Sequence, residues 1–162
     1  MKATDGARLV FSSADIPGEI VDLLVVDTAL IKANPKLGQA LAGIWYETMA
    51  LMAQDTAEGE AARAAMAKLA GTDLETFEGQ LETTYLYADP AAAVSATSDA
   101  ALVETMTRVR DFSFSQGLFG QGARSAEAIG MEFPGGNTLG DATNITLRFD
   151  ASFMQMAADG AL

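Results

Sequence analysis

The sequence contains no cysteine and no histidine. Without cysteine, disulfide bonds, thiolate catalysis and thiolate metal sites are excluded. Without histidine, the chain lacks the usual general base near neutral pH and the commonest metal ligand. Long apolar runs are also missing, since the richest stretch, residues 20–30, is interrupted by Asp22 and Asp27. It therefore falls short of the roughly 20 apolar residues of a membrane-spanning helix.

Basic residues are scarce. Ten lysines and arginines stand against 22 aspartates and glutamates, which gives a formal net charge of −12. A field of this sign repels phosphate backbones, so we expect no nucleic-acid binding. Acidic surfaces most often serve solubility, and the charge alone identifies no ligand.

The residues needed for catalysis are not assembled in any recognisable pattern. No Ser-x-x-Lys spacing occurs, and the glycines at 117–122 are not followed by the Gly-Lys-Ser/Thr of a phosphate loop. Asp22 and Asp27 would suit a carboxylate pair for glycoside hydrolysis, but carboxylates are frequent in so acidic a chain. We therefore predict a protein that is not an enzyme and needs no cofactor.

The apolar pattern predicts an α/β fold dominated by helix, with few strands. Strands are expected at residues 8–11, 20–26 and 144–149, and Pro17-Gly18 marks a turn between the first two. Caps and amphipathic spacing predict helices at residues 28–33, 36–54, 56–70, 72–81, 90–94, 98–116 and 150–156. The expected N-terminal caps include Asp27, Asp55, Thr72, Asp89, Asp99 and Asp150.

The longest helix carries a clear stripe. Its apolar residues recur at spacings of four and three and include Leu37, Leu41, Ile44 and Leu51. Trp45, Met49 and Met52 widen this face. Trp45 is predicted to lie in the core, whereas Tyr46 lies off the stripe. In the helix at 98–116, the predicted buried stripe is Leu102, Val103, Met106, Val109 and Phe112.

The best binding candidate is the segment from Ser12 to Asp22. It places hydroxyls, carboxylates and a turn between two predicted strands, and loops at strand ends are where α/β folds bind ligands. The candidate ligand-binding residues are Glu19, Ser12, Ser13 and Asp22. On the residues alone, a plain turn with solvated side chains is the favoured explanation of this segment. Trp45, Tyr46, Tyr85 and Tyr87 are further residues that a pocket would use, with core packing as the alternative for Trp45.

An ordered set of segments resembles one family. The chain is similar to the periplasmic solute-binding proteins of ABC transporters of the nitrate/sulfonate/taurine type, in the urea branch associated with urea carboxylase. The resemblance rests on residues 16–22 (Ile-Pro-Gly-Glu-Ile-Val-Asp), 23–28, 34–38, 42–47, 84–87, 112–118, 147–150 and 153–160. No single segment is specific to this family, but the order in which the segments occur along the chain is specific to it.

This resemblance implies a two-lobed, type II-like binding protein with its ligand cleft between the lobes. Residues 1–85 would be the end of the second lobe, and residues 86–162 the returning C-terminal part of the first. Family members are about twice this length and carry an export signal, whereas no apolar run follows Met1 here. We therefore expect a truncated, C-terminal half of a protein that is periplasmic in its full-length form.

The branch also implies a ligand and a partner. Urea or guanidinium would be bound between the lobes, and the partner would be an ABC transporter permease. Glu19 would suit a planar cation with several N–H donors better than an anion. The alternative is an acidic helical interaction fragment that docks on another chain and binds no small molecule.

Overall fold

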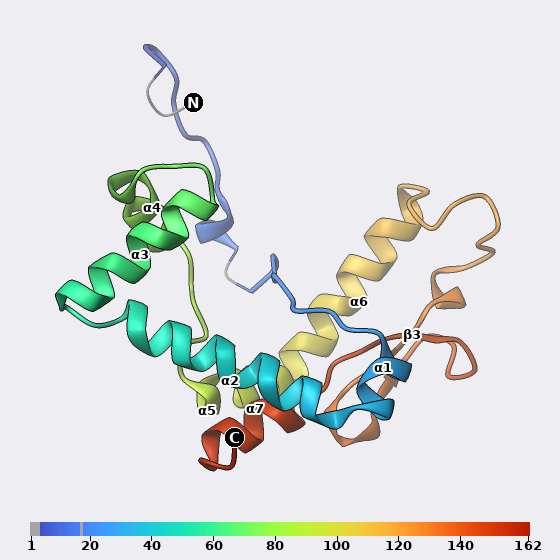
Figure 1. Ribbon diagram of the computed structural model, residues 1–162. Coiled ribbons are helices and arrows are strands. Elements are labelled where there is room, and N and C mark those ends of the chain that lie inside the picture. Colours follow the sequence, from blue (N-terminus) through green and yellow to red (C-terminus); the bar gives the residue numbers. More distant parts are fainter. Residues whose placement is uncertain (1–3, 17) are drawn as a thin grey trace.

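The computed structural model describes residues 4–16 and 18–162. Helices account for 54% of the chain, and three short strands form one small sheet, which confirms the predicted helix-dominated α/β class. Figure 1 shows two parts that project from a common base: α3 and α4 on one side and α6 on the other, with α2, α5 and α7 below.

The base is built by three helices of different length. Helix α2 (Pro35–Met52) packs against α3 (Ala57–Leu69) and against α7 (Ser152–Ala158). Helix α5 also packs on α7, so the C-terminal helix joins the two halves of the chain. The remaining helices are α1 (Thr28–Ala33), α4 (Leu74–Leu81), α5 (Pro90–Ser98) and α6 (Ala100–Ser115), with 3-10 turns η1 (Ser13–Asp15), η2 (Ala126–Ala128) and η3 (Pro134–Gly136).

Side-chain caps fix three helix starts at the predicted positions. The Asp27 carboxylate accepts hydrogen bonds from the backbone N–H groups of Ala29 and Leu30, at 2.9 and 3.0 Å. Asp89 and Asp99 cap α5 and α6 in the same way, as predicted.

Three predicted caps are wrong by one residue: Asp150 precedes Ala151, the N-cap of α7, and a neighbouring residue replaces each of the other two. Thr56, not Asp55, caps α3 by accepting a hydrogen bond from the N–H of Gly59 at 3.2 Å. Asp73, not Thr72, caps α4. In both cases two adjacent residues have capping side chains, and their spacing to the helix does not distinguish them.

The sheet lies near the C-terminus. Its strands are β1 (Gly130–Glu132), β2 (Thr138–Leu139) and β3 (Ile145–Arg148), in the order β2-β1-β3. Strand β1 pairs antiparallel with β2 and parallel with β3. The predicted strand at 144–149 is confirmed. β1 and β2 were missed because two- and three-residue strands among glycines show too little alternation.

The predicted strands at residues 8–11 and 20–26 are wrong. Both segments are extended but form no ladder with any described strand, and their apolar side chains are largely exposed: Val10 is 94% and Val25 is 71% exposed. A strand requires a neighbour for its backbone groups, and an apolar run predicts strand formation only if that neighbour is present.

The buried face of α2 matches the predicted face in part. Met49 and Met52 are buried, as predicted, whereas Trp45 is 42% exposed and Tyr46 is half-buried. Gly38 is buried as well, and a Cβ atom at this position would lie 2.3 Å from the ring of Phe153. Helix α7 therefore packs on the smallest residue of α2, which hydrophobicity does not indicate.

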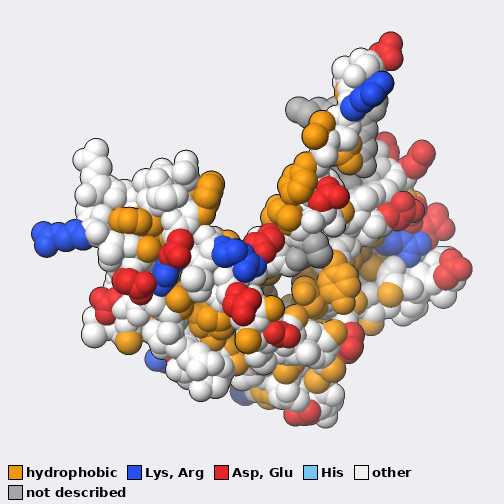
Figure 2. Space-filling view, turned by 180° about the vertical axis from the view of Figure 1, so that it is seen from behind, with side chains coloured by type: hydrophobic (Ala, Val, Ile, Leu, Met, Phe, Trp, Pro, Cys, Tyr) orange, Lys and Arg blue, Asp and Glu red, His pale blue; other side chains and the backbone are white. Residues whose placement is uncertain are grey.

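The core of the described residues is small. In α6 only Thr105 and Arg110 are buried, while Phe112 of the predicted buried stripe is 63% exposed. Figure 2 shows hydrophobic side chains along the projecting N-terminal part and around the open notch between the two arms. The buried hydrophobic residues are Met49, Met52, Ala67, Ala93, Met131 and Phe133.

Candidate functional site

The predicted hydroxyl residues serve the local backbone. The Ser12 hydroxyl accepts a hydrogen bond from the N–H of Ala14, and the Asp15 carboxylate accepts one from the N–H of Ser12 at 2.8 Å. This is a complete capping box for η1. Ser13 lies within that turn and is exposed.

Glu19 already binds a guanidinium group, that of Arg108 on α6. The Arg108 Nη2 atom donates to the Glu19 carboxylate and also to the hydroxyl of Thr105, at 2.9 Å for the latter. This pair joins two segments that are far apart in the sequence. The guanidinium group beside Glu19 thus comes from the chain itself.

Asp22 is exposed and takes part in no hydrogen bond or ion pair with another described residue. The predicted turn at Pro17-Gly18 falls partly on Pro17, which lies outside the described residues. Gly18 has a φ of 84°, a conformation that favours glycine. The structure thus brings Glu19 to α6 but does not gather the four predicted residues around one point.

A pocket lies elsewhere, at the carboxyl ends of the parallel strands β1 and β3. Its volume is about 420 Å³. The carboxyl ends of parallel strands are where open α/β sheets bind ligands. The lining residues come from three segments, namely α1 and the turns after each strand: Thr28, Ile31, Lys32, Glu132, Phe133, Pro134, Gly135, Gly136, Arg148, Phe149, Asp150, Ala151 and Ser152.

Two stacked rings form the apolar part of this strand-end pocket. The rings of Phe133 and Phe149 lie 5.0 Å apart between centroids and are inclined by 10°. Phe133 is buried and Phe149 half-buried. Each residue directly follows its strand, so the pairing of β1 with β3 places the two rings together.

Four charged side chains surround these rings. Arg148 donates from Nε to the Glu132 carboxylate at 3.1 Å. The Asp150 carboxylate accepts from the N–H of Ser152 at 2.8 Å. Lys32 forms no ion pair with any described residue. The pocket therefore offers both cationic donors and carboxylate acceptors beside an aromatic surface.

Glycines shape the remaining wall of the pocket. Gly135 and Gly136 have φ values of 84° and 85°, so a side chain at either position would strain the backbone. Two left-handed residues in succession turn the chain sharply between β1 and β2. The sequence signal for this site is the Phe133-Pro134-Gly135-Gly136 segment, which is not among the predicted binding residues.

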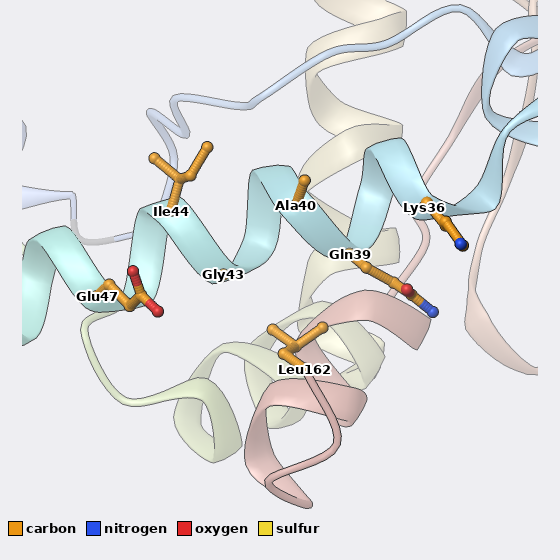
Figure 3. A pocket seen from close by; sticks show the side chains of 7 residues that line it. All are labelled: Lys36, Gln39, Ala40, Gly43, Ile44, Glu47 and Leu162. Atoms are coloured by element: carbon orange, nitrogen blue, oxygen red, sulfur yellow. The ribbon is translucent and has the colours of Figure 1, made fainter.

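A second groove runs between α2 and the C-terminal residues. Figure 3 shows Leu162 below α2, with Gln39 and Glu47 on either side and Ile44 pointing away. Its volume is about 400 Å³. It has no aromatic side chain and only Lys36 and Glu47 as charged groups, so it offers less specific chemistry than the strand-end pocket.

The aromatic candidates lie outside both pockets. Tyr85 and Tyr87 pack edge to face at 4.8 Å and are exposed. Burial of Tyr46 raises the pKa of its hydroxyl, and the nearby charge of Asp89 adds to this.

Within residues 4–16 and 18–162, no cluster of three His, Cys, Asp or Glu residues has the geometry of a metal site. No helix among these residues combines the length and hydrophobicity that crossing a bilayer demands.

Comparison of the chain with known proteins found no matching protein family, no similar curated protein and no similar solved structure.

Proposed function

We propose that the chain is the solute-binding part of an ABC importer, that its solute is urea or guanidinium, and that its protein partner is the transporter permease. The periplasm is the compartment in which such a protein works. The ordered resemblance through residues 16–160 supports this proposal, and the strand-end pocket is the observation that carries it.

The pocket chemistry favours urea over guanidinium. Urea is planar and neutral, with one carbonyl acceptor and four N–H donors. Lys32 would donate to the carbonyl oxygen, and the carboxylate of Asp150 would accept from the amino groups. The Phe149 ring offers a flat surface for the planar solute. A guanidinium ion has donors only, so it could not accept a hydrogen bond from Lys32.

Glu19 supports guanidinium as the second solute. Its carboxylate is paired with the guanidinium of Arg108, the group that a free guanidinium ion would replace. The two candidate solutes thus point to two different positions in the chain, and variants at these positions separate them.

An interaction module is the alternative, and one observation favours it. The extended segments at residues 8–11 and 20–26 leave apolar side chains exposed, including Val10 at 94% and Leu24 at 68%. Exposed apolar residues that lie close together mark protein interaction sites.

Equilibrium dialysis with isotopically labelled urea tests the proposal. Lys32→Met should weaken urea binding by about 10- to 150-fold, the effect of losing a hydrogen bond of roughly 1.5 to 3 kcal/mol to a charged group. Lys36→Met is the matched control, because it removes the same charge outside the strand-end pocket. No binding of either solute by the parent chain, or equal losses in both variants, would remove this function.

A further inference from the structure

We infer that the open edge of β3 is a docking site for residues Leu23–Val26 of the same chain, which would add to the sheet as a fourth, parallel strand. This arrangement goes beyond solute binding, since it concerns how the chain completes its own sheet. Three features of the described residues support it: an open edge, an unpaired extended segment, and a contact that aligns the two.

Strand β3 has one neighbour in the described part of the chain. The sheet order β2-β1-β3 places it at the edge, and its recorded ladder is with β1. Its side chains alternate, with Ile145 and Leu147 half-buried and Thr146 exposed. A four-residue edge of this kind offers its unpaired backbone groups to a further strand.

The segment Leu23–Val26 has unpaired backbone groups as well. No backbone hydrogen bond is formed by residues 20–26 with any other described residue. Leu23, Leu24 and Val25 are 47%, 68% and 71% exposed. Strands in the interior of parallel sheets are continuous apolar runs of this kind, with both faces covered.

One contact brings the ends of the two elements together. The Arg148 Nη1 atom lies 3.4 Å from the hydroxyl of Thr28. Arg148 is the last residue of β3, and Thr28 follows the extended segment at the start of α1. Both elements therefore run toward the same point, as parallel strands do, and Figure 1 shows α1 beside β3.

The residues that line the strand-end pocket also support this placement of Leu23–Val26 beside β3. Its lining consists of residues that follow β1, residues that follow β3, and Thr28, Ile31 and Lys32, which follow the extended segment. The ends of three extended segments thus meet at one pocket. Docking of Leu23–Val26 would make all three of them strands of one parallel sheet.

The occupant we assign is the chain's own segment and not that of a second copy. Between Arg8 and Lys32 the sequence has no basic residue, while it has Asp15, Glu19, Asp22 and Asp27. A second copy would have to approach against the repulsion between two chains of net charge −12, whereas the chain's own segment would not. The contact of Thr28 with Arg148 already holds the segment's own end near β3.

Cysteine trapping tests the docking. The chain has no native cysteine, so any disulfide must form between introduced thiols. If Thr28 lies beside Arg148, the parallel register places Val26 beside Thr146, within β3. Neighbouring strands are about 4.8 Å apart, which suits a disulfide. The double variant Val26→Cys with Thr146→Cys should form an intrachain disulfide at least about 10-fold faster than Val10→Cys with Thr146→Cys, since thiol pairing follows the population of close approach.

The control pair retains the Thr146 change, so that loss of the hydrogen bond from this hydroxyl to the Gly130 carbonyl is matched. Equal rates in the two variants, or disulfides only between chains, would overturn the inference. Hydrogen exchange on the unmutated chain gives a second reading: amide exchange in residues 23–26 should be slower than in residues 8–11, and equal, unprotected exchange would contradict docking. A chain that shows docking but binds neither urea nor guanidinium would retain this inference and lose the solute proposal.

Discussion

Glu19 and Arg108 form an ion pair that joins the N-terminal segment to α6 across 89 positions of the sequence. Their side chains are 31% and 55% exposed. Pairs with this exposure contribute about 0–1 kcal/mol to stability, because water screens the charges and both side chains lose freedom. The pair is therefore weak enough for a competing guanidinium ion to replace Arg108.

Glu19→Gln should weaken guanidinium binding by up to about fivefold, because an ion pair at this partly exposed carboxylate contributes about 0–1 kcal/mol. The effect on the neutral solute urea should be smaller. Titration calorimetry with guanidinium chloride measures the change. Glu60→Gln, which neutralises an exposed carboxylate on α3, is the control. Unchanged affinity for both solutes would remove Glu19 from the binding site.

The exposed apolar residues predict self-association of the isolated chain. Val10, Phe112 and Leu118 are 94%, 63% and 70% exposed, and such surface associates when electrostatic repulsion is screened. Because the net charge is −12, added NaCl should increase the average mass measured by light scattering. Phe112→Gln should reduce the effect. A monodisperse monomer at all salt concentrations, with one cooperative thermal transition, would contradict the prediction.

Gly140→Ala should destabilise the fold by about 1–3 kcal/mol. Gly140 has a φ of 79°, and a Cβ atom there would lie 2.1 Å from the carbonyl oxygen of Ile129. Gly122→Ala is the control, since Gly122 has open space around it and no positive φ. Thermal melts of the two variants measure the difference. Equal melting temperatures would show that residues 129–140 are packed differently.

The local signals in the sequence were sufficient for most of the helices. Carboxylates such as Asp27, Asp89 and Asp99 cap helices through hydrogen bonds to residues two or three positions away, so a short window contains the whole interaction. Packing between residues far apart in the sequence cannot be predicted from such short windows. The approach of Phe153 to Gly38, 115 positions earlier, places this glycine on the buried face of α2.

In the candidate site, too, local signals could be predicted from the sequence and long-range contacts could not. Glu19 was chosen for its affinity for guanidinium, and its carboxylate does bind one, but the partner Arg108 is distant in the sequence. The strand-end pocket was missed because its charged residues, Lys32, Glu132, Arg148 and Asp150, come from three separate segments. Only the pairing of β1 with β3 and the contact of Arg148 with Thr28 bring them together.

Acid should destabilise the region around β3 through Asp141. Hydrogen bonds from the Thr143 hydroxyl and the Thr143 N–H, at 2.7 and 2.8 Å, hold the pKa of the Asp141 carboxyl below its usual value of 3.8. A carboxyl whose pKa is lower in the folded than in the unfolded state stabilises the fold above the unfolded pKa. That contribution is lost as the pH falls through the folded pKa.

Asp141→Asn should therefore reduce the decrease in melting temperature that accompanies acidification below about pH 4, because the amide still accepts hydrogen bonds but does not titrate. Thermal melts of the parent chain and the variant at a series of pH values measure this. Asp22→Asn is the matched control, since Asp22 forms no hydrogen bond with another described residue and should leave the acid-dependent decrease close to that of the parent. If the Asp141 variant and the parent lose stability in parallel, the hydrogen bonds of Asp141 do not contribute to acid sensitivity, and the turn that precedes β3 is held by the backbone bond from the N–H of Asn144 to the Asp141 carbonyl instead.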